Sequence, residues 1–131
     1  MYLLTNSAQP DSAYVALADS KGVIVVKKIA GNEGKRPVLL KEIDAMLLQH
    51  DLTPQQLKGV IVVTGPGHFS FLRTGIVIAN TFGWVLNIPV VGVMGDALLA
   101  EELWDRARVD MLQAKEYVQV NPEYGRERTH L

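Results

Sequence analysis

The sequence predicts an α/β fold in which three antiparallel strands are followed by alternating helices and parallel strands. Two observations lead to this prediction. Short β-branched runs separated by turn residues fill the part before residue 31, and an apolar segment of helical length then lies between two strand-like runs, 60–64 and 88–93. The 131 residues are 48% hydrophobic and 21% charged, a composition typical of one globular domain.

The N-terminal part is expected to form an antiparallel meander. Its strands are predicted at Tyr2–Thr5, Ala13–Ala18 and Val23–Ala30. A polar loop joins the first two, and the turn Asp19-Ser20-Lys21-Gly22 joins the last two.

Two amphipathic helices are expected outside the central segment. The first begins at Pro37, which suits a first helical position, and runs to His50 with apolar residues at three- and four-residue steps. One further turn should begin at Thr53-Pro54. The second helix should open at Gly95-Asp96 and end near Arg106, with Leu98, Leu99, Leu103 and Trp104 facing inward.

The central segment is predicted to be a strand, a turn and a helix. Val60–Thr64 is a buried strand, Gly65-Pro66-Gly67 is the turn, and the helix runs from Phe69 or Ser70 to Leu86. The strand at Ile88–Val93 should be parallel to the first, because a helix connects them. This order is that of one actin-like, or ribonuclease-H-like, lobe.

The glycine turn has two interpretations. Gly65 and Gly67 allow close backbone approach, and the following helix would point free N–H groups at an anion, which Arg73 could help to bind. Alternatively, the glycines only let a strand reverse into a helix capped by Ser70, and Arg73 holds backbone carbonyls or a nearby acid. Neither a phosphate-loop lysine nor a dinucleotide fingerprint accompanies the turn.

The central helix is apolar nearly all round, so both of its sides must be covered. Gly75, Ala79 and Gly83 form a stripe on which another helix could approach closely. The sheet covers one side, and either the helix at 37–50 or a second protein covers the other. The candidate interface residues are Phe71, Leu72, Gly75, Ile78, Ala79, Phe82 and Gly83, with Leu40 and Leu47 from the preceding helix.

Composition excludes several classes of function. A net charge of −1 gives no basic excess for binding nucleic acid directly. The absence of cysteine excludes disulfides and thiolate metal sites and fits the cytoplasm. The most apolar window, 76–93, is broken by polar residues and a proline and is not expected to span a membrane.

Catalytic groups are sparse. Phosphate-hydrolysing proteins of this fold class hold a metal with a carboxylate on the first strand, where this chain has Thr5-Asn6-Ser7. The three histidines show no ligand spacing, so we expect no metal and no cofactor. His68, with Ser70, is the one candidate base, and its alternative role is packing in the turn.

From Val60 to Ala100 the pattern resembles the bacterial TsaB family. The strand, Gly65-Pro66-Gly67, Phe69, Leu72-Arg73, Gly75 and then Ile88-Pro89-Val90-Val91-Gly92-Val93 carry the resemblance. His68 and Phe71 depart from it, because the family usually has a small residue and a glycine there. The resemblance implies a non-catalytic partner of TsaD in making threonylcarbamoyladenosine on tRNA, with TsaE as an ATP-hydrolysing third component.

The resemblance also implies how the chain is organised and paired. Residues 1–108 would be the N-terminal lobe, and 109–131 an arm or the remnant first strand of a second lobe, with a strand-like run at 114–120. Its helices would pair with TsaD or, in isolation, with a second copy. The alternative is a small hydrolase or phosphotransferase that uses Gly65-Pro66-Gly67 with Arg73 and His68.

Overall fold

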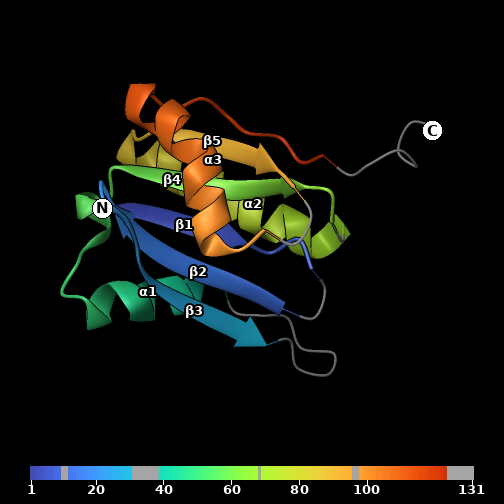
Figure 1. The fold of residues 1–131 in the computed structure, drawn as a ribbon, viewed down its shortest axis with the longest axis horizontal. Coiled ribbons are helices and arrows are strands. Elements are labelled where there is room, and N and C mark those ends of the chain that lie inside the picture. Colours follow the sequence, from blue (N-terminus) through green and yellow to red (C-terminus); the bar gives the residue numbers. More distant parts are fainter. Residues whose placement is uncertain (10–11, 31–38, 68, 96–97, 124–131) are drawn as a thin grey trace.

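The computed structural model describes residues 1–9, 12–30, 39–67, 69–95 and 98–123, and these form one mixed five-stranded sheet with three α-helices (Figure 1). The strand order is β3-β2-β1-β4-β5. The strands are β1 (Tyr2–Asn6), β2 (Ser12–Asp19), β3 (Gly22–Ala30), β4 (Gly59–Gly65) and β5 (Val90–Met94). The first three strands pair antiparallel, whereas β4 pairs parallel with both β1 and β5. The predicted fold class is therefore confirmed.

The helices cover the sheet on both faces. They are α1 (Leu39–Gln49), α2 (Phe69–Leu86) and α3 (Ala100–Gln113), with a short 3₁₀ turn, η1 (Pro54–Gln56), before β4. Figure 1 shows α3 crossing the front of the sheet, with α1 and α2 behind it. Since α2 begins at Phe69, Ser70 lies in its first turn and does not precede it as a cap.

The core is centred on β1 and β4. Every residue of β4 is buried, as expected for a β-branched run between two helical layers. Successive residues of β1 point to opposite faces: the Tyr2 ring lies 5.4 Å from the Trp104 ring of α3, whereas Ser7, just beyond the strand, donates a hydrogen bond to the Phe71 carbonyl of α2.

The last helix differs from the prediction at both ends. It begins at Ala100, because the Leu99 N–H is already bonded to the Glu102 carboxylate at 3.0 Å. Leu98 is buried as predicted but precedes the helix, and Leu99 is 60% exposed instead of facing inward. The helix continues to Gln113, since Ala107 and Met111 extend its buried stripe beyond Arg106.

The segment after α3 is not a strand. Residues 114–123 are extended but pair with no strand of the sheet. α3 itself runs across the predicted boundary between 108 and 109. The division into a lobe and an arm stays a prediction, and the expected helix start at Pro37 lies outside the described residues.

Candidate functional site

The carboxyl ends of the three parallel strands meet at one edge of the sheet. Asn6 ends β1, Gly65 ends β4 and Met94 ends β5. The Gly95 N–H donates to the Gly65 carbonyl at 2.8 Å, which holds the ends of β4 and β5 together. Sheets with parallel strands place their ligands at this edge, so it is the first place to look for a site.

Asn6 ends β1, the strand on which phosphate-hydrolysing proteins of this fold class carry a metal-binding carboxylate. It is buried, and its side-chain amide donates to the Leu98 carbonyl at 3.2 Å while its oxygen accepts the Ala8 N–H at 3.0 Å. A carboxylate could accept the second bond but could not donate the first. The hydrogen bond from Asn6 therefore holds Leu98, which precedes α3, at the end of β1.

Tyr14 binds the same backbone carbonyl as Asn6. Its hydroxyl donates to the Leu98 carbonyl at 2.8 Å. Burial raises the pKa of Tyr14 well above the ordinary value for tyrosine, and the negative charges of Glu101 and Glu102 raise it further, although the Asn6 side chain acts in the opposite direction. The hydroxyl consequently stays protonated and keeps its bond to Leu98.

The glycine turn is packed against the chain's own backbone. Gly65 has a φ of 141° and a cis bond to Pro66, and a Cβ on Gly65 would overlap the Glu123 carbonyl. A Cβ on Gly67 would lie 2.6 Å from the Ala8 carbonyl oxygen. Both glycines are thus explained by close approach within the chain. His68 lies outside the described residues.

Arg73 lies one turn into α2 and is exposed. It lines a shallow hollow of about 370 Å³ with Ser70, Thr74, Val77 and Ile78, all from α2 itself. Among the described residues, no three histidine, aspartate or glutamate side chains come together as metal ligands could.

The stripe of small residues on α2 faces the chain's own interior. A Cβ on Gly75 would overlap the Ser7 hydroxyl, and one on Gly83 would overlap Val90 of β5. Ala79, Leu72 and Leu47, also predicted as partner contacts, are at most 2% exposed. This placement corrects the expectation of a helix-binding stripe, because residues of the chain's own sheet and adjoining segments already occupy it. Helical periodicity marks a buried face without identifying what buries it.

A groove between α1 and α2 is lined by three of the other residues predicted to contact a partner. Leu40, Ile78 and Phe82 line this hollow of about 430 Å³. The rest of its lining was not predicted, although the three- and four-residue spacing from Ile78 indicates which α2 positions share that face. The remaining lining residues are Asp44, Pro54, Gln55, Thr81, Val85 and Leu86. Phe71, the last candidate, is half-buried near the start of α2.

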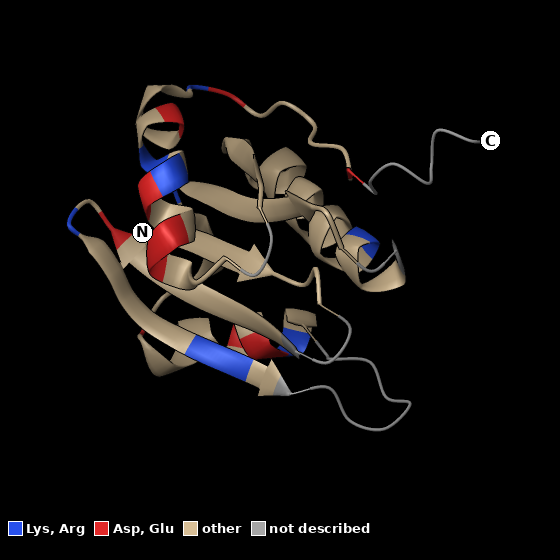
Figure 2. Ribbon diagram, turned by 45° about the vertical axis from the view of Figure 1, so that its right-hand side comes forward, with Lys and Arg blue, Asp and Glu red and all other residues tan. Residues whose placement is uncertain are grey.

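The outer surface of α2 is apolar beside this groove. Trp84 is 75% exposed, Val85 63% and Val77 58%. Figure 2 shows charged bands on α1 and α3, whereas α2 is uncharged along nearly its whole length.

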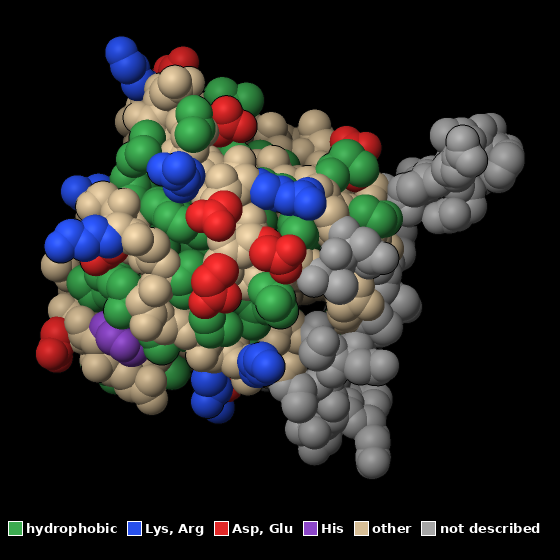
Figure 3. All heavy atoms as spheres, in the orientation of Figure 1, with side chains coloured by type: hydrophobic (Ala, Val, Ile, Leu, Met, Phe, Trp, Pro, Cys, Tyr) green, Lys and Arg blue, Asp and Glu red, His purple; other side chains and the backbone are tan. Residues whose placement is uncertain are grey.

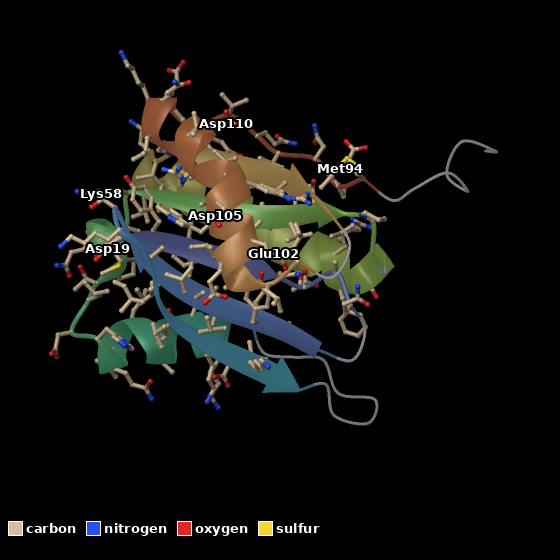
Figure 4. The ribbon with its side chains drawn as sticks, viewed as in Figure 1. Asp19, Lys58, Met94, Glu102, Asp105 and Asp110 are labelled. Carbon is tan, nitrogen blue, oxygen red and sulfur yellow. The ribbon has the colours of Figure 1, made fainter. Side chains whose placement is uncertain are left out.

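The opposite face of the sheet has a different character. Acidic and basic side chains gather over α3 in Figure 3, and Glu102, Asp105 and Asp110 all come from this helix in Figure 4. Leu99, Val109 and Leu112 are also exposed on the α3 side, but the α1 and α2 side combines exposed apolar side chains with a groove, the kind of surface that partners cover.

Comparison with known proteins gives a consistent picture. The family model "TsaD: tRNA N6-adenosine threonylcarbamoyltransferase" matches residues 33–106. The chain is 34% identical over 58 residues to the tRNA threonylcarbamoyladenosine biosynthesis protein TsaB of Bacillus subtilis, covering 44% of this chain and 25% of the relative. It is 38% identical over 61 residues to the tRNA N6-adenosine threonylcarbamoyltransferase of Desulforapulum autotrophicum, covering 47% of this chain and 17% of that protein.

A solved structure supports the same fold. YeaZ from Pseudomonas aeruginosa superposes with a TM-score of 0.64 at 20% identity, covering 80% of this chain and 48% of the other. The chain thus spans a quarter or less of the two curated relatives and about half of this structural neighbour. Within the described residues, none of the helices combines the length and the apolar character needed to cross a lipid bilayer.

Proposed function

Because this chain belongs to the TsaD, or tRNA N6-adenosine threonylcarbamoyltransferase, family and is TsaB- and YeaZ-like within it, we propose that it is a non-catalytic subunit in threonylcarbamoyladenosine synthesis on tRNA. It pairs with a TsaD-like protein through α1 and α2. A TsaE-like ATPase acts with the pair, tRNA is bound only indirectly, and the assembly works in the cytoplasm. In isolation the chain pairs with a second copy.

The groove between α1 and α2 is the observation that supports this proposal most directly. Its lining includes Leu40, Ile78, Phe82 and Val85, and Val77 and Trp84 extend the apolar surface along α2. A helix of a partner can lie in such a groove and bury these side chains from water. Asp44 is the one acid in the lining and would meet a basic or hydrogen-bonding group of the partner.

The non-catalytic part of the proposal rests on Asn6. The amide is engaged with Leu98 and Ala8, and a neutral amide does not supply the charge with which a carboxylate holds a divalent metal. The chemistry would then belong to the TsaD-like partner.

A binding experiment tests the pairing. The TsaD-like protein of the same organism should retain the chain in a pull-down, and Leu40→Glu should weaken retention at least about tenfold by placing an unpaired charge in the groove. The matched control is Leu112→Glu, because Leu112 is 56% exposed on α3, on the other face of the sheet. Equal retention of the two variants, or no retention of the unmodified chain, would refute the proposal.

Calorimetry separates the proposal from the alternative enzyme. The isolated chain should give no heat with magnesium and ATP. Saturable binding that disappears in Arg73→Ala would instead favour a hydrolase or phosphotransferase that uses Gly65-Pro66-Gly67 with Arg73 and His68.

A further inference from the structure

The segment beyond α3 returns to the sheet and follows β5 toward the edge where the parallel strands end (Figure 1). Its residues 117–123 are called the strap here. The strap pairs with no strand, yet three of its residues contact glycines of the lobe: Tyr117 contacts Gly83, Val120 contacts Gly92, and the Glu123 backbone contacts Gly65.

These glycines form notches that fit the strap. A Cβ built on Gly83 would lie 2.5 Å from the Tyr117 ring, and one on Gly92 would lie 2.7 Å from a Val120 methyl. A larger residue at either position would overlap the strap and also a side chain of the sheet, Val90 at Gly83 and Thr64 at Gly92, since real Cβ contacts are almost never that short. The notches come from α2 and β5, which are separate elements.

Asn80 holds the strap by hydrogen bonds. Its amide donates to the Val120 carbonyl at 2.8 Å, and its oxygen accepts the Val120 N–H at 3.0 Å and the Tyr117 hydroxyl at 3.1 Å. The side-chain amide thus pairs with one residue of the strap as a neighbouring strand would. Farther along, the Glu123 N–H donates to the Thr64 carbonyl at 2.7 Å.

We propose that the strap is a detachable latch, held by Asn80, which covers the Gly65 end of β4 and opens as a unit while the rest of the lobe stays folded. A segment held by few hydrogen bonds, whose side chains are half-buried at Tyr117, Val120 and Pro122 and exposed elsewhere, opens at lower free energy than the core. Opening uncovers Gly65 at the edge shared by β1, β4 and β5. A molecule that approaches Gly65 must therefore displace Glu123 first.

The latch is separate from the groove of the proposed partner surface. Asn80 is two positions from both Ile78 and Phe82, which places it about 160° around the helix from the groove. Val77 and Trp84 lie closer to Asn80, on neighbouring turns. Release of the strap should consequently leave the contacts in the groove unchanged, so that failure of one proposal is distinguishable from failure of the other.

Amide hydrogen exchange on the full chain tests the latch. In the unmodified chain the Val120 and Glu123 amides should be protected, but less than those of β4. Asn80→Ala should raise the exchange of both amides about tenfold or more, because three hydrogen bonds are lost, while β1 and β4 exchange as before. Thr81→Ala is the matched control, since the Thr81 hydroxyl donates to the Val77 carbonyl of the same helix and, among the described residues, makes no hydrogen bond to the strap.

Three results of this hydrogen-exchange experiment would overturn the latch proposal. Unprotected Val120 and Glu123 amides in the unmodified chain would show that the strap is not docked. Equal acceleration in the strap and in β4 would show that it does not open separately, and no acceleration in Asn80→Ala would show that Asn80 does not hold it. Should Asn80→Ala fail to fold, Tyr117→Phe removes one of the three bonds and should raise exchange at Val120 and Glu123 to a smaller extent.

Discussion

At the scale of single residues, the polar side chains at the end of β1 serve the fold. Asn6 and Tyr14 both donate to the Leu98 carbonyl, so two separate strands fix the path into α3. The sequence suggested the lack of a carboxylate at this position, but not this role for the amide. The Leu98 carbonyl lies more than eighty positions away along the chain, beyond the reach of local patterns.

Tyr14 makes stability sensitive to alkaline pH. Burial raises its pKa in the folded state above 10.0, the value expected in the unfolded chain, so ionisation above that pH stabilises only the unfolded chain. The contribution is complete below pH 10.0 and is lost as pH rises further.

Urea denaturation of the unmodified chain and Tyr14→Phe between pH 8 and 11 measures this contribution. The variant should be less stable at pH 8 by about 1 kcal/mol, because it lacks the bond to Leu98. The difference between the two proteins should shrink above pH 10.0, since other titrating groups affect both alike. A difference that stays constant to pH 11 would contradict the prediction.

At the scale of elements, the small residues of α2 explain how closely this helix approaches the sheet. Ser7 follows β1 and lies where a side chain on Gly75 would project, and its hydroxyl donates to the Phe71 carbonyl at 2.8 Å. Replacement of Gly75 therefore disturbs the docking of α2 on β1 before it affects any partner.

Gly75→Ala should lower the free energy of unfolding by about 1–3 kcal/mol, because the new methyl group overlaps the Ser7 hydroxyl. Ser7→Ala removes that hydroxyl, so the double variant should be more stable than Gly75→Ala alone. Chemical denaturation of the four proteins in a double-mutant cycle measures the coupling. Strict additivity of the two substitutions would show that the Ser7 hydroxyl is not what limits this position.

At the scale of the whole molecule, the two faces of the sheet differ in what they offer to solvent. The α3 side carries charge, whereas the α1 and α2 side combines the groove with exposed Val77, Trp84 and Val85. An exposed apolar face of this kind favours association with another protein. The chain covers about half of the YeaZ structure that it resembles.

Light scattering should therefore find the isolated chain at twice its own 14.4 kDa, through pairing of the α1 and α2 faces. Leu40→Glu should shift it to a monomer, whereas Leu112→Glu should remain paired. A monomer at the highest soluble concentration of the unmodified chain would remove the expectation of self-pairing. Such a result would not test pairing with a TsaD-like protein, which the pull-down measures.

The sequence by itself determined the order of the elements, the antiparallel meander and the parallel direction of β4 and β5, because β-branched runs, turn residues and helical spacing act locally. The pairing of β1 with β4, which joins the two halves of the sheet, was not predicted. It could not determine what covers the stripe at Gly75, Ala79 and Gly83, since periodicity shows only that a face is buried. The chain's own residues cover that stripe: Ser7, just beyond β1, lies against Gly75, and Val90 of β5 and Tyr117 lie against Gly83.

The tertiary structure alone decided the role of Asn6 and the course of the chain after α3. Asn6 meets Leu98, and Asn80 meets Val120, across long separations in the chain. Hydrogen bonds of this kind form only once the sheet and helices have brought their partners together, so no local pattern encodes them.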